Sequence, residues 1–123
     1  MRAYRERITL QAPTISEASG NYGTKRVTFT AGSFVSGLKD LHASFEHVGG
    51  GESMRSGSEQ LDPEVIGIFE CRLPRVAVKP TYQLLHVNAG NKAYGVVSAR
   101  PKEGVDEGGF RTLRIFVKAL ADV

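Results

Sequence analysis

Three histidines are the side chains that could hold a metal ion in this chain. His42 and His47 lie five positions apart in one extended segment, so a side-chain period of two directs them to opposite faces. His86 belongs to another extended segment. No third ligand shared with either of the first two can be named, so the histidines do not predict a metal site.

The single cysteine, Cys71, is in register with Phe69 and Leu73 on an apolar strand face. It therefore has the character of a small buried hydrophobe, and nothing near it in the sequence would lower the pKa of its thiol. One cysteine excludes an intramolecular disulfide and a metal site built on paired thiolates. The sequence does not identify Cys71 as a nucleophile.

A glycine-rich run, Gly49-Gly50-Gly51-Glu52-Ser53, superficially resembles a phosphate-binding loop. It lacks the lysine that reaches phosphate, and no helical pattern follows it. Carboxylates in this part of the chain are Glu46, Glu52, Glu59, Asp62 and Glu64. They are scattered through a flexible region, whereas catalysis requires groups that are fixed by rigid surroundings. The sequence therefore predicts a protein that is not an enzyme and that has no cofactor.

Basic residues slightly outnumber acidic ones, 16 to 13, which gives a formal charge of +3. This excess is smaller than that of dedicated DNA-binding proteins. The one dense basic stretch contains Arg2, Arg5 and Arg7. A solvated strand edge is the simpler interpretation of these arginines, and a contact with DNA or a protein partner is the alternative.

The chain length of 123 residues fits one domain, residues 1–123, with a single modest core. No internal repeat or long linker divides it. The first residues are charged and lack the apolar stretch of a signal peptide. The longest apolar runs, such as Val65–Phe69, are far too short to cross a bilayer. We expect a protein that is cytosolic when it is synthesised.

Apolar and polar residues alternate with a period of two in most of the chain, which is typical of half-buried strands. The segments with this pattern are 7–11, 26–30, 41–46, 65–73, 82–87, 92–99 and 110–119. No segment shows a helical stripe of useful length. About seven short strands predict an all-β fold, either a small antiparallel β-barrel or a sandwich.

Turn signals suggest how these strands are connected. The first two segments suggest an amino-terminal hairpin with a long connection through Gly20–Gly23. The fourth is more continuously apolar, as in strands that are covered on both faces. Pro80 requires a bend, because proline cannot donate to a central ladder. The turn composition of Asn88–Asn91 predicts another hairpin.

Residues 48–63, with the sequence VGGGESMRSGSEQLDP, interrupt the strand pattern. They offer little to bury, and the glycine triplet has a high backbone entropy that opposes ordering. A structureless segment of this length within a compact domain is usually functional or disordered. We expect a long, projecting, glycine-rich loop that becomes ordered only against a neighbour. The alternative is a mobile surface loop that does not contact a neighbour.

Short segments along the whole chain share a family pattern. Arg5–Gln11 is similar to an initial R-x-R-I-T-L-Q strand, and His42–Glu46 occupies the place of a short W-A-x-V strand. Gly50–Glu52 matches a G-x-E element, Ile68–Arg72 a strand that ends in Arg, and Ala93–Val96 an x-Y-x-I strand. In this order and spacing, the chain resembles the head–tail joining family of tailed bacteriophages, also called head–tail adaptor or head-closure (stopper) proteins.

This resemblance implies a structural subunit of the virion neck. The chain would form a β-barrel in a homo-oligomeric, hexameric ring beneath the portal and its adaptor, with a tail terminator or tail tube below. The ring would extend the channel for double-stranded DNA, help to retain the packaged genome and dock the tail. The protein would be made in the host cytoplasm, and no membrane would be involved.

The resemblance also implies a role for the glycine-rich loop, because such proteins close the channel with a long projecting loop. The residues that would form this gate are Gly49, Gly50, Gly51, Glu52, Ser53, Met54, Arg55 and Glu59. The charges in this run alternate in sign, which suits contacts between adjacent copies better than tight phosphate binding.

Two other functions remain open from the sequence. One is a tail terminator or another neck or tail-tube protein, since short motifs separate these ring-forming classes poorly. The other is a small nucleic-acid-binding β-barrel that uses its basic first strand. That function predicts aromatic side chains exposed beside the arginines for base stacking, and only Tyr4 is well placed for it.

Overall fold

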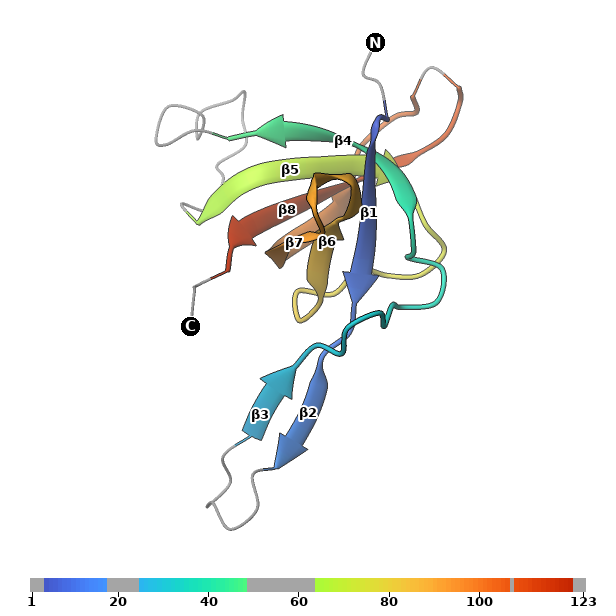
Figure 1. The fold of residues 1–123 in the computed structure, drawn as a ribbon. Coiled ribbons are helices and arrows are strands. Elements are labelled where there is room, and N and C mark those ends of the chain that lie inside the picture. Colours follow the sequence, from blue (N-terminus) through green and yellow to red (C-terminus); the bar gives the residue numbers. More distant parts are fainter. Residues whose placement is uncertain (1–3, 18–24, 49–63, 107, 121–123) are drawn as a thin grey trace.

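The computed structural model describes residues 4–17, 25–48, 64–106 and 108–120. Six antiparallel strands form a closed barrel in the order β1-β4-β5-β8-β7-β6, and β2 and β3 form a separate two-stranded sheet that projects from it (Figure 1). The strands are β1 (Glu6–Gln11), β2 (Thr14–Glu17), β3 (Lys25–Thr28), β4 (Leu41–His47), β5 (Val65–Arg72), β6 (Gln83–His86), β7 (Lys92–Pro101) and β8 (Thr112–Ala119). The one helical element in the described residues is the short 3-10 turn η2 (Val87–Ala89).

The all-β, antiparallel prediction is confirmed, and the fold is a barrel, not a sandwich. The predicted strand number is wrong, because the barrel has six strands and a separate hairpin adds two. The predicted amino-terminal hairpin between segments 7–11 and 26–30 is also wrong. β1 pairs with β4 and β6, whereas β3 pairs with β2. The break lies at Pro13, which cannot donate to a ladder and separates β1 from β2.

Alternation along the strands places one row of side chains inside the barrel. The buried residues of this core are Ile8, Leu10, Leu38, Ala43, Phe69, Cys71, Leu84, Tyr94, Val96, Leu113, Ile115 and Val117. A narrow barrel of this kind is filled by its own side chains and is not a pore. The barrel is therefore a solid, rigid support for whatever projects from it.

The strand β5 is covered on both faces, as its continuous apolar sequence predicted. Its outward-facing Ile68 lies in a second buried cluster with Val48, Val65 and Phe116. Val48, which the sequence assigned to the projecting loop, is thus buried, and its N–H donates to the carbonyl oxygen of Ile66 at 2.9 Å. This backbone bond extends the pairing of β4 and β5 by one residue beyond the end of β4 at His47 and by two beyond the expected end of the strand.

The predicted hairpin around Asn88–Asn91 is confirmed, since β6 and β7 pair antiparallel on either side of it. Gly90 and Asn91 adopt the left-handed conformation there, with φ of 72° and 57°, which glycine and asparagine tolerate best. The predicted bend near Pro80 is also present. The N–H of Tyr82 donates to the carbonyl oxygen of Lys79 at 3.0 Å and closes the turn before β6.

Candidate functional site: a projecting hairpin and the groove at its base

In the part of the chain that the structure describes, the histidines and the cysteine do not form one cluster. His42 and His47 are exposed on β4, whereas His86 is buried at one end of the barrel. The Nε2 atom of His86 lies 2.7 Å from Oε1 of Glu6. In the residues that the structure describes, no three His, Cys, Asp or Glu side chains are close enough to hold a metal ion. The described part also contains no helix that is long and apolar enough to span a membrane.

His86 packs against aromatic side chains of the barrel. Its ring centroid lies 5.1 Å from that of Phe69 in an edge-to-face arrangement and 5.7 Å from that of Phe45. The rings of Phe45 and Phe69 are 4.5 Å apart, and Tyr94 completes the cluster. Aromatic pairs at such distances stabilise a core beyond the area they bury. His86 shares its strand face with the buried Leu84, so the period of two could have identified this position.

Cys71 is buried, as predicted, with 1% of its surface exposed. Burial raises the pKa of its thiol to about 12, and the neighbouring Glu70 carboxylate contributes to the same rise. The thiolate is the nucleophilic form of cysteine. At neutral pH this thiol is therefore both protonated and inaccessible.

The basic first strand is exposed, but its aromatic neighbour is engaged. Arg5 and Arg7 are exposed, and Arg2 lies outside the described residues. The hydroxyl of Tyr4 donates to Oδ2 of Asp106 at 3.2 Å, and its ring is half-buried. This ring is therefore less available for base stacking than the sequence suggested.

Asn88 has a structural role that the sequence did not indicate. Its Oδ1 accepts a hydrogen bond from the N–H of Arg7 at 3.0 Å, and its Nδ2 donates to the carbonyl oxygen of Arg5 at 3.2 Å. One amide thereby satisfies two backbone groups of the first strand. The sequence feature that could have indicated this role is the position of Asn88 in a hairpin turn, where asparagine side chains commonly form hydrogen bonds with the backbone.

The predicted channel gate falls outside the described residues. This applies to all of its members, Gly49, Gly50, Gly51, Glu52, Ser53, Met54, Arg55 and Glu59. The candidate site is therefore built from the hairpin of β2 and β3, the segment that follows it, and two grooves.

The hairpin of β2 and β3 points away from the barrel (Figure 1). Ile15 and Val27 are directly opposite each other in its register. Their side chains are 59% and 56% exposed. The hairpin thus presents an aliphatic pair to its surroundings, and the sequence alone predicted no function for either residue.

A segment that we call the strap, residues 29–40, connects the hairpin to β4 and runs against the barrel. The N–H of Leu10 donates to the carbonyl oxygen of Leu38, and the N–H of Val35 donates to the carbonyl oxygen of Leu10, both at 2.9 Å. Leu38 itself is fully buried in the core. The strap therefore occupies the edge of β1 beyond its short pairing with β4, which ends at Ile8.

A buried amide, Gln11, holds the strap in place. Its Nε2 donates to the carbonyl oxygens of Thr30 and Ser33, each at 3.1 Å. Its Oε1 accepts a hydrogen bond from Nε2 of Gln83 at 2.8 Å. Gln11 points to the outer face of the barrel but is only 3% exposed, because the strap covers it. This amide fixes the root of the hairpin relative to the barrel.

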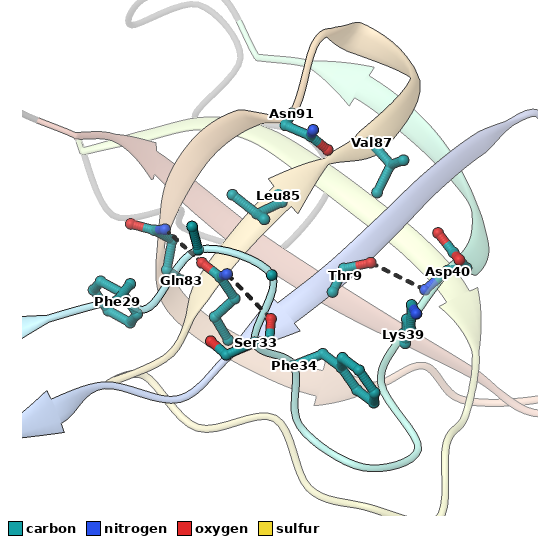
Figure 2. Close-up of a pocket in the computed structure, with 13 residues that line it drawn as sticks. Thr9, Phe29, Ser33, Phe34, Lys39, Asp40, Gln83, Leu85, Val87 and Asn91 are labelled. Carbon is teal, nitrogen blue, oxygen red and sulfur yellow. Dashed lines mark hydrogen bonds between the residues drawn. The ribbon is translucent and has the colours of Figure 1, made fainter.

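A groove of about 460 Å³, the base groove, lies between the strap and the turn after β6 (Figure 2). Thr9 and Leu85 form its floor, and Phe34 and Val87 contribute apolar walls. The ammonium of Lys39 lies 4.7 Å from the centre of the Phe34 ring. Such a mixed groove can bind a peptide segment or a small molecule, but its lining contains no histidine or cysteine.

A second groove of about 310 Å³, the side groove, lies between the segment Leu73–Val78 and the end of β7. Apart from Arg75, all of its lining is aliphatic, and the remaining residues are Ala99, Pro101 and Leu113. Leu113 belongs to the barrel core, so this groove reaches the core from outside.

Comparisons with protein-family models, curated proteins and solved structures find no match to this chain. A filled barrel, an aliphatic pair on a projecting hairpin and an aliphatic groove can form contacts with other chains. The described residues do not present a nucleophile together with a base that could activate it.

Proposed function

We propose that this chain is a structural ring subunit of the head-to-tail connector of a tailed bacteriophage, of the stopper or head-closure class. In this function, copies of the chain surround the DNA channel below the portal and its adaptor. They help to retain packaged DNA and provide the surface on which the tail docks. The order of the sequence segments that resemble the head–tail joining family motivates this assignment.

The observation that carries the proposal is the projecting hairpin with its exposed pair, Ile15 and Val27. A two-stranded hairpin alone is marginally stable in water. Its aliphatic pair gains stability only when a neighbour removes it from water. A contact between the hairpin of one copy and a different surface of the next copy is heterologous, and heterologous contacts that close produce rings.

The filled barrel supports a channel that lies between subunits. Phe69, Leu84 and Ile115 are fully buried within the barrel, so DNA cannot pass through a single subunit. In the proposed ring, DNA passes along the symmetry axis and the barrels form the wall. A closed, hydrogen-bonded barrel suits this role because it resists deformation while the hairpins make the contacts.

The proposal includes the absence of catalysis. His86 packs among aromatic rings, and the Cys71 thiol is buried with a raised pKa. Replacing His42, His47, His86 or Cys71 singly with alanine should alter folding or assembly at most. A turnover that copurifies with the protein and is lost in one of these folded variants would contradict this part of the proposal.

A suppressible stop codon in the gene, placed in the phage genome that carries it, tests the function. Under non-suppressing conditions, we expect tailless heads that lose DNA, seen by electron microscopy and as DNA sensitive to nuclease. DNA-filled heads together with tails of abnormal length would favour a tail terminator. Normal infectious particles would refute a role in the neck.

Complementation of this mutant with hairpin variants ties the phenotype to the site. Val27→Lys should fail to restore tailed particles, because it places a charge in the exposed aliphatic pair. Thr28→Lys is the matched control, since Thr28 is also exposed but pairs with Thr14. Equal rescue by both variants would show that the aliphatic pair is not an assembly contact.

A further inference from the structure

The end of β7 has one free edge among the described residues. β6 pairs with β7 only from Lys92 to Gly95, whereas β8 pairs with it as far as Pro101. Beyond Gly95, the edge of β7 that faces away from β8 has no strand beside it in the described part of the chain. The side groove lies along this edge, with Ala99 and Pro101 in its lining.

The opposite wall of the side groove is the segment Leu73–Val78. Leu73 is 37% exposed and Ala77 is also exposed, although both border a groove that leads to the buried Leu113. This lining offers aliphatic contacts and one cation, Arg75. It fits branched aliphatic side chains better than a charged or hydrogen-bonding ligand.

The hairpin has the complementary features. It carries two branched aliphatic side chains, Ile15 and Val27, opposite each other. Its two strands pair only with each other in the described residues, so each has an outer edge that can pair with another strand. A hairpin that lies along an exposed strand edge and places apolar side chains in an adjacent groove is a common mode of recognition.

The hairpin cannot fill the side groove of its own chain. It points away from the barrel (Figure 1). The groove is lined by residues between Leu73 and Leu113, and none of them belongs to the hairpin. Since the two surfaces lie on different parts of one chain, a contact between copies is heterologous and propagates from each copy to the next.

We infer that the side groove receives the hairpin of a second copy of this chain, with Ile15 and Val27 seated against the aliphatic lining beside the free edge of β7. This inference rests on the proposed ring function and names the contact that closes the ring. It makes each subunit both a donor of a hairpin and an acceptor of one. Pro101 limits the contact at the far end of the edge, because it has no N–H to donate.

Cysteine cross-linking of the whole chain tests this contact. The native Cys71 can remain, because it is buried. The variant with Val27→Cys and Ala77→Cys carries one thiol on the hairpin and one in the side groove. A short bismaleimide, applied at protein concentrations up to the millimolar range, should produce a ladder of covalent oligomers beyond the dimer.

Two control variants test whether the hairpin contacts the side groove and no other surface. Val27→Cys with Ala31→Cys places the second thiol at an exposed alanine of the base groove and should give no ladder. Val27→Cys alone should remain monomeric on a denaturing gel. A ladder in the first control would place the hairpin in the base groove, and strong dimers in the second would show hairpin-to-hairpin pairing. Either result, or no cross-linking in any variant, would overturn the inference.

A groove-blocking variant gives an independent measurement. Ala77→Arg should abolish self-association in sedimentation experiments, whereas Ala31→Arg should not change it. Both positions are exposed, so the barrel should fold in each case. If Ala77→Arg restores tailed particles in the stop-codon mutant, the groove contact is wrong while the neck function stands. If the stop-codon mutant itself makes normal particles, the proposed function fails instead.

Discussion

The buried amide of Gln11 should control the attachment of the strap, and Gln11→Met tests this directly. Methionine has a similar length and shape but cannot donate to a carbonyl oxygen. The variant loses the two bonds to Thr30 and Ser33 and the bond from Gln83. The strap connects the hairpin to the barrel, so the change should loosen the base of the hairpin while the barrel remains folded.

The size of the effect follows from the partners that remain. The carbonyl oxygen of Thr30 still accepts hydrogen bonds from the N–H and hydroxyl of Ser33, at 3.1 and 2.7 Å. The Ser33 carbonyl and the Gln83 amide lie near the surface and can bond to water. Each of the three lost bonds therefore costs about 1 kcal/mol. The apolar methionine offsets part of this loss, so the net destabilisation should be about 2 kcal/mol.

Urea unfolding measures the total effect, and amide hydrogen exchange locates it. Exchange should accelerate at Val35 and Leu10, whose N–H groups join the strap to β1. Gln83→Met is the matched control, because it removes only the bond to Gln11 and leaves both strap bonds in place. It should cost about 1 kcal/mol and leave exchange at Val35 unchanged. Equal effects of the two variants on Val35 would refute the assignment of the strap to Gln11.

Three further changes have defined outcomes. Gly67→Ala places a Cβ at 2.5 Å from Cε1 of Phe45 and should destabilise the barrel by about 1–3 kcal/mol in urea unfolding, with part of the loss recovered by adding Phe45→Leu. Cys71 should resist thiol reagents until the chain unfolds. Because the pKa of its thiol is raised from 9.0 to about 12 in the folded chain, its contribution to the free energy of unfolding is fully present below pH 9 and is lost as the pH rises toward 12. Relative to Cys71→Val, the loss should be about 1.4 kcal/mol per pH unit. The pKa of Asp106 is lowered, chiefly by the hydrogen bond from the N–H of Phe110. The contribution of this carboxylate to stability is therefore present above its ordinary pKa and is lost as the pH falls through the lowered value. Hydrogen exchange of the Phe110 amide should accelerate in that pH range, and Asp106→Ala should show fast exchange of this amide at every pH.

Periodicity predicted the parts of the fold that depend on one strand at a time. The alternation of Ile8 and Leu10 with polar residues identifies which side of β1 is buried, because successive side chains point to opposite faces. The hairpin at Asn88–Asn91 was predictable for a similar reason. Its turn residues and both of its strands lie within a short stretch of sequence.

The pairing of strands that are distant in the sequence was not predictable from one segment at a time. The sequence gives β1 and β3 similar patterns, but β1 pairs with β4 and β6. The sequence pattern indicates that Gln11 is an ordinary polar residue on the outer face of its strand. The carbonyl groups that it binds are 19 and 22 residues away along the chain, so the pattern does not reveal these contacts. The proposed role of the hairpin pair could not be inferred from the sequence for the same reason. Val27 has the alternating pattern of a half-buried strand, and Ile15 lies outside the expected strands, whereas in the structure both belong to a hairpin that projects from the barrel.

Apolar side chains outside the core differ in whether a cation of the same chain lies over them. Among the described residues, cations lie over aromatic rings in four places: Lys39 over Phe34, Arg72 over Phe110, Lys92 over Tyr94, and Arg100 and Arg114 over Phe116. Lysine and arginine can cover apolar surface with their stems and gain a cation–π attraction there. Ile15 and Val27 are aliphatic, so they present no π face to a cation, and both remain more than half exposed. We therefore propose a second chain that offers aliphatic contacts as the partner of this pair, whereas Phe34 and Phe110, which are 48% and 49% exposed, are partly covered by cations of the same chain.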